Sequence, residues 1–344
     1  MKRTVLGLFV LAICPFIAAQ QFTGSWDGGV SCPGKPALPL QVWIGARPDG
    51  TLIGILRSPV QGFASDLKSI SINANILEVQ ADVPNNFIAT FNGPVVGTTW
   101  TPIFQQGPFS CAAQFSLFGT PLTMTRLPIP PSYQTEPMWC WLTVGEMIFH
   151  HFGVLTSADP PGGGSQCTVL RTIMLGSPNF ACTVNCAVCG SMGGGSSREI
   201  SGMLSDFPRR RKALGQAVPT IFSAVAGTLT PTEVTAELDA GRPVIIGISP
   251  GQQFQPTSIN PFFPAMHVAL IVGHVKITND FYVINDPFPF HKFVPFNQNP
   301  YVLAGGVPLV ASQAGVPSSV AYLIPASYLS QLHWTESILV RVEP

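Results

Sequence analysis

A proline-dense stretch at residues 127–131 (LPIPP) divides this 344-residue chain into two segments with different hydrophobic patterns. Proline fixes φ and has no amide hydrogen, so we expect these residues to form a stiff linker. Before it, residues 22 to 127 contain short alternating apolar runs, such as 38–44 and 51–56, separated by turn residues. About eight such runs at roughly ten-residue spacing predict an all-β domain over residues 21–127, either a meander barrel or a sandwich.

After the linker the pattern changes. Residues 139–152 have the periodicity of a helix that ends before Gly153, and residues 231–240 predict a second, shorter helix. Strand-like runs follow, at residues 243–248, 268–272, 281–284 and 337–342. A helix followed by an antiparallel sheet is typical of an α+β domain. We therefore expect a linker over residues 128–133 and an α+β domain over residues 134–344.

Composition excludes some classes of partner. The formal net charge is zero and only 10% of the residues are charged, which argues against a nucleic-acid partner because phosphate binding needs a concentrated basic surface. Residues 1–20 have the features of a secretory signal peptide: Lys2 and Arg3, an apolar run, and cleavage near Ala19–Gln20. No later stretch is long and apolar enough to predict an integral membrane span. We expect the mature protein to be secreted or periplasmic, in an oxidising compartment.

The cysteines support this location. Removing Cys14 with the signal peptide leaves seven, and an odd number suggests one free thiol among three disulfide bonds. Cys32 and Cys111 are alone in the N-terminal segment, so we expect them to pair. The other four candidates, Cys167, Cys182, Cys186 and Cys189, allow three connectivities, which the sequence leaves open. The spacing of Cys186 and Cys189 also permits a zinc site, but the expected export favours disulfides and no metal.

Cys140 is the candidate free thiol. It lies between Trp139 and Trp141 at the start of the predicted helix, where the helix dipole and free N–H groups stabilise a thiolate. Gln134, six residues upstream, could donate a side-chain N–H to a developing oxyanion beside the Cys140 backbone N–H. A buried structural cysteine is the alternative, because cysteine is often buried.

A histidine and an acid follow in the order of a thiol hydrolase. His267 opens the apolar run 268–272, and residues 276–280 predict the turn between two antiparallel strands. That turn brings residues 286–288 opposite His267. Asn285 and Asp286 point to opposite faces of a strand, so only one of them can orient the imidazole. We predict that Asp286 does so, with Asn285 as the alternative.

Residues 130–344 resemble the papain-like cysteine proteases that include secreted bacterial effector proteases, and more distantly the bacteriocin-leader peptidases. The matching pieces are Gln134 with Trp139-Cys140-Trp141, Ser165-Gln166-Cys167 with Cys182 and Cys186, residues 238–247, residues 267–274, and Asn285-Asp286-Pro287. The resemblance implies a catalytic triad of Cys140, His267 and Asp286, with Gln134 in the oxyanion hole. The N-terminal segment resembles the lipocalin-like β-domain that precedes several secreted bacterial hydrolases.

The expected function is therefore that of a secreted cysteine endopeptidase. Its partner would be a protein or peptide substrate, and the chemistry needs no cofactor. The sequence leaves two alternative functions open. One is amidase or transglutaminase-like acyl transfer on the same triad, and the other is ligand binding by a protein whose protease-like part is inert.

Overall fold

The computed structural model describes residues 21–47, 49–119, 122–156, 158–159, 163–175, 181–190, 192, 195–249, 267–310 and 320–343. The signal peptide expected at residues 1–20 lies outside these ranges. The chain divides into two compact units. The first contains residues up to 61 together with residues 65–124, and the second contains residues 62–64 and everything from Thr125 onward.

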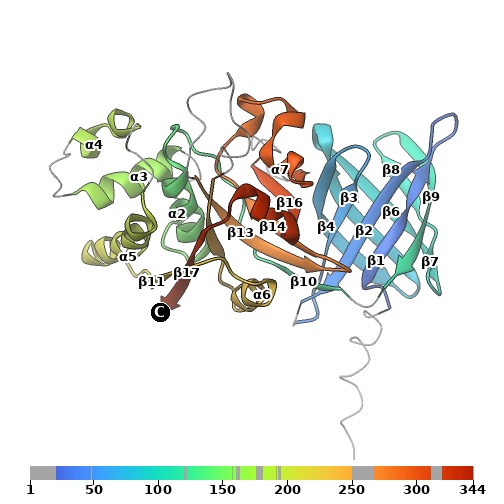
Figure 1. The fold of residues 1–344 in the computed structure, drawn as a ribbon. Helices are drawn as coiled ribbons and strands as arrows, with labels where there is room; N and C mark the ends of the chain where they lie inside the picture. Colours follow the sequence, from blue (N-terminus) through green and yellow to red (C-terminus); the bar gives the residue numbers. More distant parts are fainter. Residues whose placement is uncertain are drawn as a thin grey trace, which may run out of the picture. The chain divides into compact units, whose positions relative to one another are not determined.

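The first unit is a closed barrel of eight antiparallel strands (Figure 1). Its strands follow the order β1–β2–β3–β4–β5–β6–β8–β9, and β9 pairs with β1 to close the ring. A two-residue strand, β7, pairs with β6 and β9. The bounds are β1 Gly24–Ser31, β2 Leu38–Ala46, β3 Leu52–Ser58, β4 Phe63–Asn73, β5 Ile76–Val83, β6 Phe87–Val96, β7 Thr99–Trp100, β8 Ile103–Gln106 and β9 Phe109–Phe118.

Aromatic side chains stabilise this barrel. Trp26, Phe91, Trp100 and Phe115 are fully buried, and the Trp100 and Phe115 ring centroids lie 5.1 Å apart. Rings of this size each remove a large apolar area from water. Gly28 allows β1 to approach β9, since a Cβ there would lie 1.9 Å from a backbone oxygen of β9. The aromatic cluster and this close approach together hold the two strands that close the ring.

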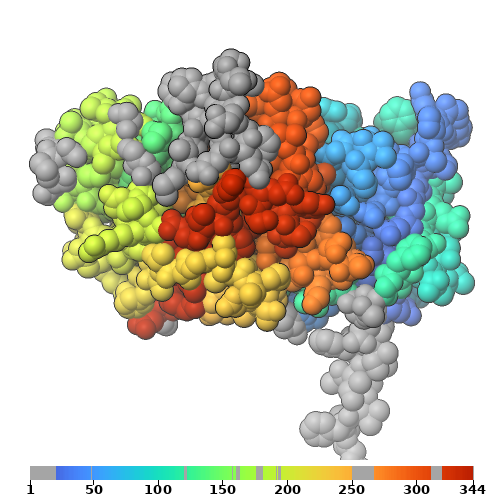
Figure 2. All heavy atoms as spheres, viewed as in Figure 1, coloured from blue at the N-terminus to red at the C-terminus, as the bar shows by residue number. Residues whose placement is uncertain are grey.

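The second unit contains an antiparallel sheet whose described strands follow the order β11–β17–β12–β13–β14–β16–β15. Strands β11 and β17 are far apart in the sequence but pair along seven residues. Figure 2 shows yellow atoms, from the part of the chain that contains β11, beside red atoms of the C-terminal part. The bounds are β11 Thr220–Ala226, β12 Val244–Ile248, β13 His267–Lys276, β14 Asp280–Asn285, β15 Val307–Val310, β16 Ala321–Pro325 and β17 Glu336–Glu343. A short strand, β10 (Thr123–Arg126), lies at the boundary between the units.

Helices pack on this sheet. α2 contacts β13, α5 contacts β11, and α3 contacts both α2 and α5, so these helices form one group (Figure 1). Capping boxes begin α5 and α6, formed by Ser196 with Glu199 and by Thr230 with Glu233. The bounds are α2 Cys140–His151, α3 Gly163–Met174, α4 Ala181–Val184, α5 Ser197–Ala213, α6 Pro231–Asp239 and α7 Pro300–Leu303.

The expected α+β papain-like architecture is wrong. The protein is mostly β, with a closed eight-stranded barrel, further strands in the second unit and only 28% helix. The sequence pattern missed β11, β15 and β16. β11 leaves Phe222 and Val225 exposed, β15 has only four residues, and β16 is a short apolar run without alternation. Periodicity cannot identify such strands, because pairing with distant partners sets their conformation.

The proline-dense stretch does not run through solvent. Leu127 and Ile129 are buried, and the Leu127 N–H donates to the Val272 carbonyl in the second unit. The stretch therefore packs as part of that unit.

The six paired cysteine candidates form three disulfides, Cys32–Cys111, Cys167–Cys186 and Cys182–Cys189. Three disulfides fit the oxidising compartment expected for a secreted or periplasmic protein. Within the part of the chain that the structure describes, no helix has the length and apolarity needed to cross a membrane.

Candidate active site

Cys140 is the first residue of α2 and carries the unpaired thiol of the described chain. Its side chain is buried, with 6% of the residue exposed. Trp139 precedes the helix and provides no side-chain cap, so the first-turn N–H groups are not occupied by a capping side chain. A thiol at this position lies in the positive field of the helix N-terminus, which stabilises a thiolate.

The disulfide-bonded segment holds the residue before the nucleophile. The Trp139 indole N–H donates to the Cys189 carbonyl at 3.2 Å, and Cys189 is bonded to Cys182. Thr143 donates through both its amide and its hydroxyl to the Trp139 carbonyl, which fixes the first turn of α2. The cysteine cluster therefore helps to position Cys140. Its four sulfurs are all in disulfides, so they are not available as the zinc ligands considered from their spacing.

His267 begins β13, and its ring faces two other buried groups. Its Nε2 lies 2.6 Å from Oδ1 of Asp286, the residue after β14. Cys140 and His267 line the same pocket, and the interaction with Cys140 raises the pKa of the imidazole. Because Nε2 contacts the carboxylate, Nδ1 is the nitrogen left for the thiol. The structure thus brings Cys140, His267 and Asp286 together, with a hydrogen bond between the imidazole and the carboxylate.

The pairing register of β12, β13 and β14 explains why Asp286 lies next to His267. β12 pairs Ile248 with His267, and β14 pairs Asn285 with Leu270. A bulge between Ile271 and Gly273 shifts the β13–β14 pairing by one residue, which is the irregularity that makes counting along a strand unreliable. Asp286 lies just beyond the paired residues, at the edge that His267 occupies.

Asn285 lies on the other side. Its side-chain nitrogen donates to the Ile129 carbonyl at 2.9 Å and approaches the Met147 sulfur at 3.8 Å. It therefore helps to hold the proline-dense stretch and does not contact the imidazole. Asp286 is the residue that the structure brings to His267.

The Asp286 carboxylate accepts further hydrogen bonds. Oδ1 accepts from the Phe288 amide at 2.7 Å, and Oδ2 accepts from the Tyr301 hydroxyl at 2.6 Å. Tyr301 in turn stacks on Tyr322, with ring centroids 4.2 Å apart. Burial and the neighbouring Asp286 charge raise the pKa of Tyr301 well above its usual value, so the hydroxyl keeps its proton and remains a donor. These contacts fix the orientation of the carboxylate.

Electrostatics favour a charged imidazole. Burial by itself lowers the pKa of His267, but the Asp286 charge, the Asp286 hydrogen bond and the contact with Cys140 raise it more strongly, to about 10. The ring is therefore an imidazolium at neutral pH. The Phe288 ring packs edge-on against it, with centroids 6.2 Å apart, and limits contact with water.

A pocket of about 340 Å³ opens onto the thiol and the imidazole. Its walls come from α2, α5, β12 and β13 and from the segment before β17. They include Cys140, Trp141, Gly195, Glu199, Ile248, His267 and Glu336. The Cys140 thiol and the His267 imidazole thus both line a pocket although their side chains are largely buried.

Gln134 does not reach this pocket in the described structure. Its side-chain nitrogen donates to the Glu136 and Pro137 carbonyls, at 3.1 and 2.6 Å, while Oε1 is buried without a partner. Delivering an N–H to an oxyanion requires one of these two hydrogen bonds to break. The segment itself is well held, because Gln166 bonds to Thr135 and Tyr133 and to the buried Glu146 carboxylate.

Sequence reasoning missed Tyr301 and Phe288. Phe288 is two residues after Asp286, so its proximity could have been inferred from the turn after β14. Tyr301 is 15 residues after Asp286, and no spacing or motif predicts its contact with the carboxylate. Within the described part of the chain, no group of three or more His, Cys, Asp or Glu residues is arranged to hold a metal ion.

Comparison with protein-family models, with curated proteins and with solved structures gives no match to this chain. The geometry of the site is therefore the basis on which a function can be assigned.

Proposed function

We propose that the protein is a cysteine endopeptidase that hydrolyses peptide bonds through a thioester on Cys140. One observation carries the proposal: a buried free thiol at a helix N-terminus lies beside an imidazole whose Nε2 contacts a buried carboxylate. Nucleophile, base and orienting acid in hydrogen-bond contact form the arrangement that thiol hydrolases use.

Acylation begins with the Cys140 thiolate attacking the carbonyl carbon of the scissile bond, which forms a carbon–sulfur bond and an oxyanion. The Cys140 backbone N–H, in the first turn of α2, can stabilise that charge. Gln134 is the proposed second donor once it releases a loop carbonyl. The His267 imidazolium then gives its Nδ1 proton to the leaving amine as the carbon–nitrogen bond breaks.

Deacylation reverses these roles. Neutral His267 takes a proton from water, and the resulting hydroxide equivalent attacks the thioester carbon. The carbon–sulfur bond breaks, the acid product leaves, and thiolate and imidazolium are restored. Asp286 stays ionised throughout and keeps the ring oriented and its Nε2–H engaged. No cofactor takes part in these steps.

Secretion is part of the proposal. The three disulfides support an oxidising compartment, and the signal-peptide pattern at residues 1–20 supports export. A free thiol in that environment is open to oxidation, so reducing conditions should favour activity.

The first test is active-site labelling. Purified mature protein is treated with an epoxysuccinyl thiol inhibitor, and intact mass and peptide hydrolysis are measured in parallel. We expect one adduct that abolishes hydrolysis, no adduct on Cys140→Ala, and greatly slowed labelling of His267→Ala. His274→Ala is the matched control, because His274 lies on the same strand and pairs with Asp280 away from the thiol.

Two outcomes would overturn the proposal. Formation of amide products with added amines, in place of hydrolysis, would assign the triad to acyl transfer. Absence of any adduct on Cys140 under reducing conditions would indicate a binding protein with an inert site.

A further inference from the structure

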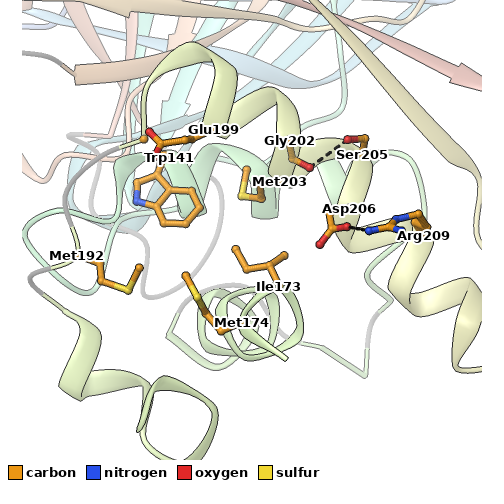
Figure 3. A pocket seen from close by; sticks show the side chains of 11 residues that line it. Trp141, Ile173, Met174, Met192, Glu199, Gly202, Met203, Ser205, Asp206 and Arg209 are labelled. Carbon is orange, nitrogen blue, oxygen red and sulfur yellow. Dashed lines mark hydrogen bonds and ion pairs between the residues drawn. The ribbon is translucent and has the colours of Figure 1, made fainter. Parts of the chain in front are cut away.

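A second, larger pocket adjoins the one that holds the thiol. Its volume is about 660 Å³, and it lies between α3, α5 and the start of α2. Figure 3 shows Trp141, Ile173, Met174, Met192 and Met203 around a common space. A volume of this size exceeds that of any single amino-acid side chain and falls in the range of ligand-binding clefts.

The chemical character of the pocket differs between its floor and its rim. Trp141 and Met203 are buried and form an apolar floor, whereas Gly202, Ser205 and Arg209 are exposed on α5 and form the rim. Methionine side chains are flexible and polarizable, so a pocket with three of them can adapt to apolar groups of different shape.

The charged side chains at the rim do not indicate a charged ligand. Asp206 is paired with both Arg209 and Arg210 along α5. Glu199 accepts hydrogen bonds from the Ser196 amide and hydroxyl in the capping box, and these bonds lower the pKa of its carboxyl. The carboxylates therefore already have partners, and the free surface of the pocket is its apolar floor.

The two pockets share part of their lining. Trp141, Gly195 and Glu199 line both of them. Trp141 is covalently next to the nucleophile, so a chain whose carbonyl carbon reaches Cys140 passes the entrance of the larger pocket within a residue or two. A group held there would be part of the molecule that reacts.

We propose that this pocket binds a large apolar side chain of the peptide substrate, such as leucine, methionine or phenylalanine. The inference builds on the proposed peptidase function and names its substrate class: polypeptides with a large apolar residue close to the scissile bond. Burial of such a side chain against Trp141 and Met203 supplies binding energy that a glycine or alanine at the same position lacks.

Gly202 allows the pocket to be filled by mutation. A Cβ built at Gly202 has open space around it, and the residue lies in the interior of α5 on the pocket rim. Because Gly202 lines the pocket, we expect a leucine there to occupy part of it, and leucine also raises helix propensity, so the fold should be kept. Gly164→Leu is the matched control, because Gly164 lies in α3, also has open space around it and does not line the pocket.

The test uses a set of tripeptidyl vinyl sulfones in which glycine, alanine, leucine or phenylalanine occupies one of the three positions before the electrophile. Rates of inactivation are divided by the rate with iodoacetamide, which has no side chain to place. For the wild type and Gly164→Leu we expect the leucine or phenylalanine probe to react about 10- to 100-fold faster than the glycine probe at one position. In Gly202→Leu that preference should fall to about threefold or less.

A binding measurement separates this inference from the function on which it builds. Acetyl tripeptide amides with leucine or glycine are titrated into Cys140→Ala and into Cys140→Ala with Gly202→Leu, using calorimetry. Rapid labelling without any side-chain preference would overturn the pocket assignment and leave the peptidase proposal standing. Absence of labelling, with leucine-selective binding that Gly202→Leu removes, would keep the pocket and overturn the peptidase. Equal binding of the leucine and glycine peptides in Cys140→Ala would overturn the pocket assignment in either case.

Discussion

The Tyr301 hydroxyl donates a 2.6 Å hydrogen bond to Oδ2 of Asp286, the carboxylate whose Oδ1 contacts His267. Both residues are fully buried. A tyrosine from α7 therefore holds the orientation of an acid that follows β14, and through it the imidazole.

Replacing Tyr301 by phenylalanine should lower kcat/KM about tenfold, because a hydrogen bond to a charged group contributes about 1.5–3 kcal/mol and only part of it acts on the transition state. Tyr322→Phe is the matched control. It removes a buried hydroxyl from the same ring stack, and that hydroxyl accepts from Asn299, whereas the Tyr301 hydroxyl is the one that donates to Asp286. Equal losses of kcat/KM in both variants, at equal thermal stability, would contradict the positioning role of Tyr301.

The pH dependence of peptide hydrolysis should follow the His267 imidazolium on the alkaline side. The pKa of His267 is raised to about 10, so kcat/KM should stay high through neutral pH and fall as the pH rises through about 10, where the leaving amine loses its proton donor. Asp286→Asn removes the charge that raises this pKa, so the alkaline fall should move to lower pH. An unchanged alkaline limb in Asp286→Asn would show that another group sets it.

The same shift predicts a dependence of stability on pH. The pKa of His267 is higher in the folded state than its ordinary value of 6.5, so the folded state binds the proton more tightly. This contribution to the free energy of unfolding is fully present below pH 6.5 and is lost as the pH rises through about 10. Urea unfolding of the wild type and of His267→Gln should therefore differ more at pH 6 than at pH 10. A difference that grows with pH would contradict the assignment.

Loss of the Cys182–Cys189 disulfide should lower the reactivity of Cys140 as well as the stability of the protein. Changing both residues to serine frees the Cys189 carbonyl that holds Trp139, so we expect slower labelling of Cys140 together with reduced stability. Cys32→Ser with Cys111→Ser is the control. It should cost about 2–5 kcal/mol in free energy of unfolding, because the bond closes a long loop, while the labelling rate stays close to that of the wild type. The measurements are denaturation curves and Cys140 labelling rates for the two double variants.

Glu146 is a buried carboxylate whose partners hold the segment before the nucleophile. It accepts hydrogen bonds from Ser132, Ser165 and Gln166. Glu146→Gln replaces one acceptor oxygen by a donor that faces these donors, so we expect a loss of about 1–3 kcal/mol in the free energy of unfolding. Glu233→Gln, at an exposed helix cap, should change stability much less. A Glu146→Gln variant as stable as the wild type would show that this network is dispensable.

Sequence alone was sufficient to select Cys140, His267 and Asp286 as candidates, because each chemical role needs a particular residue type and the helix start is readable from local pattern. The odd number of cysteines likewise predicted one free thiol beside three disulfides. These inferences depend on side-chain chemistry and on short-range geometry, and both follow directly from the amino-acid sequence.

Only the tertiary structure decided the rest. The predominance of β structure comes from strands such as β11 and β16, whose local sequence is ambiguous and whose partners are distant. The bulge in β13 determines where the strand pair places Asp286. The contact of Tyr301 with Asp286 and the pocket that Met203 lines both bring together segments that are far apart in the chain. Long-range pairing and packing created these features, and local sequence carries little information about either.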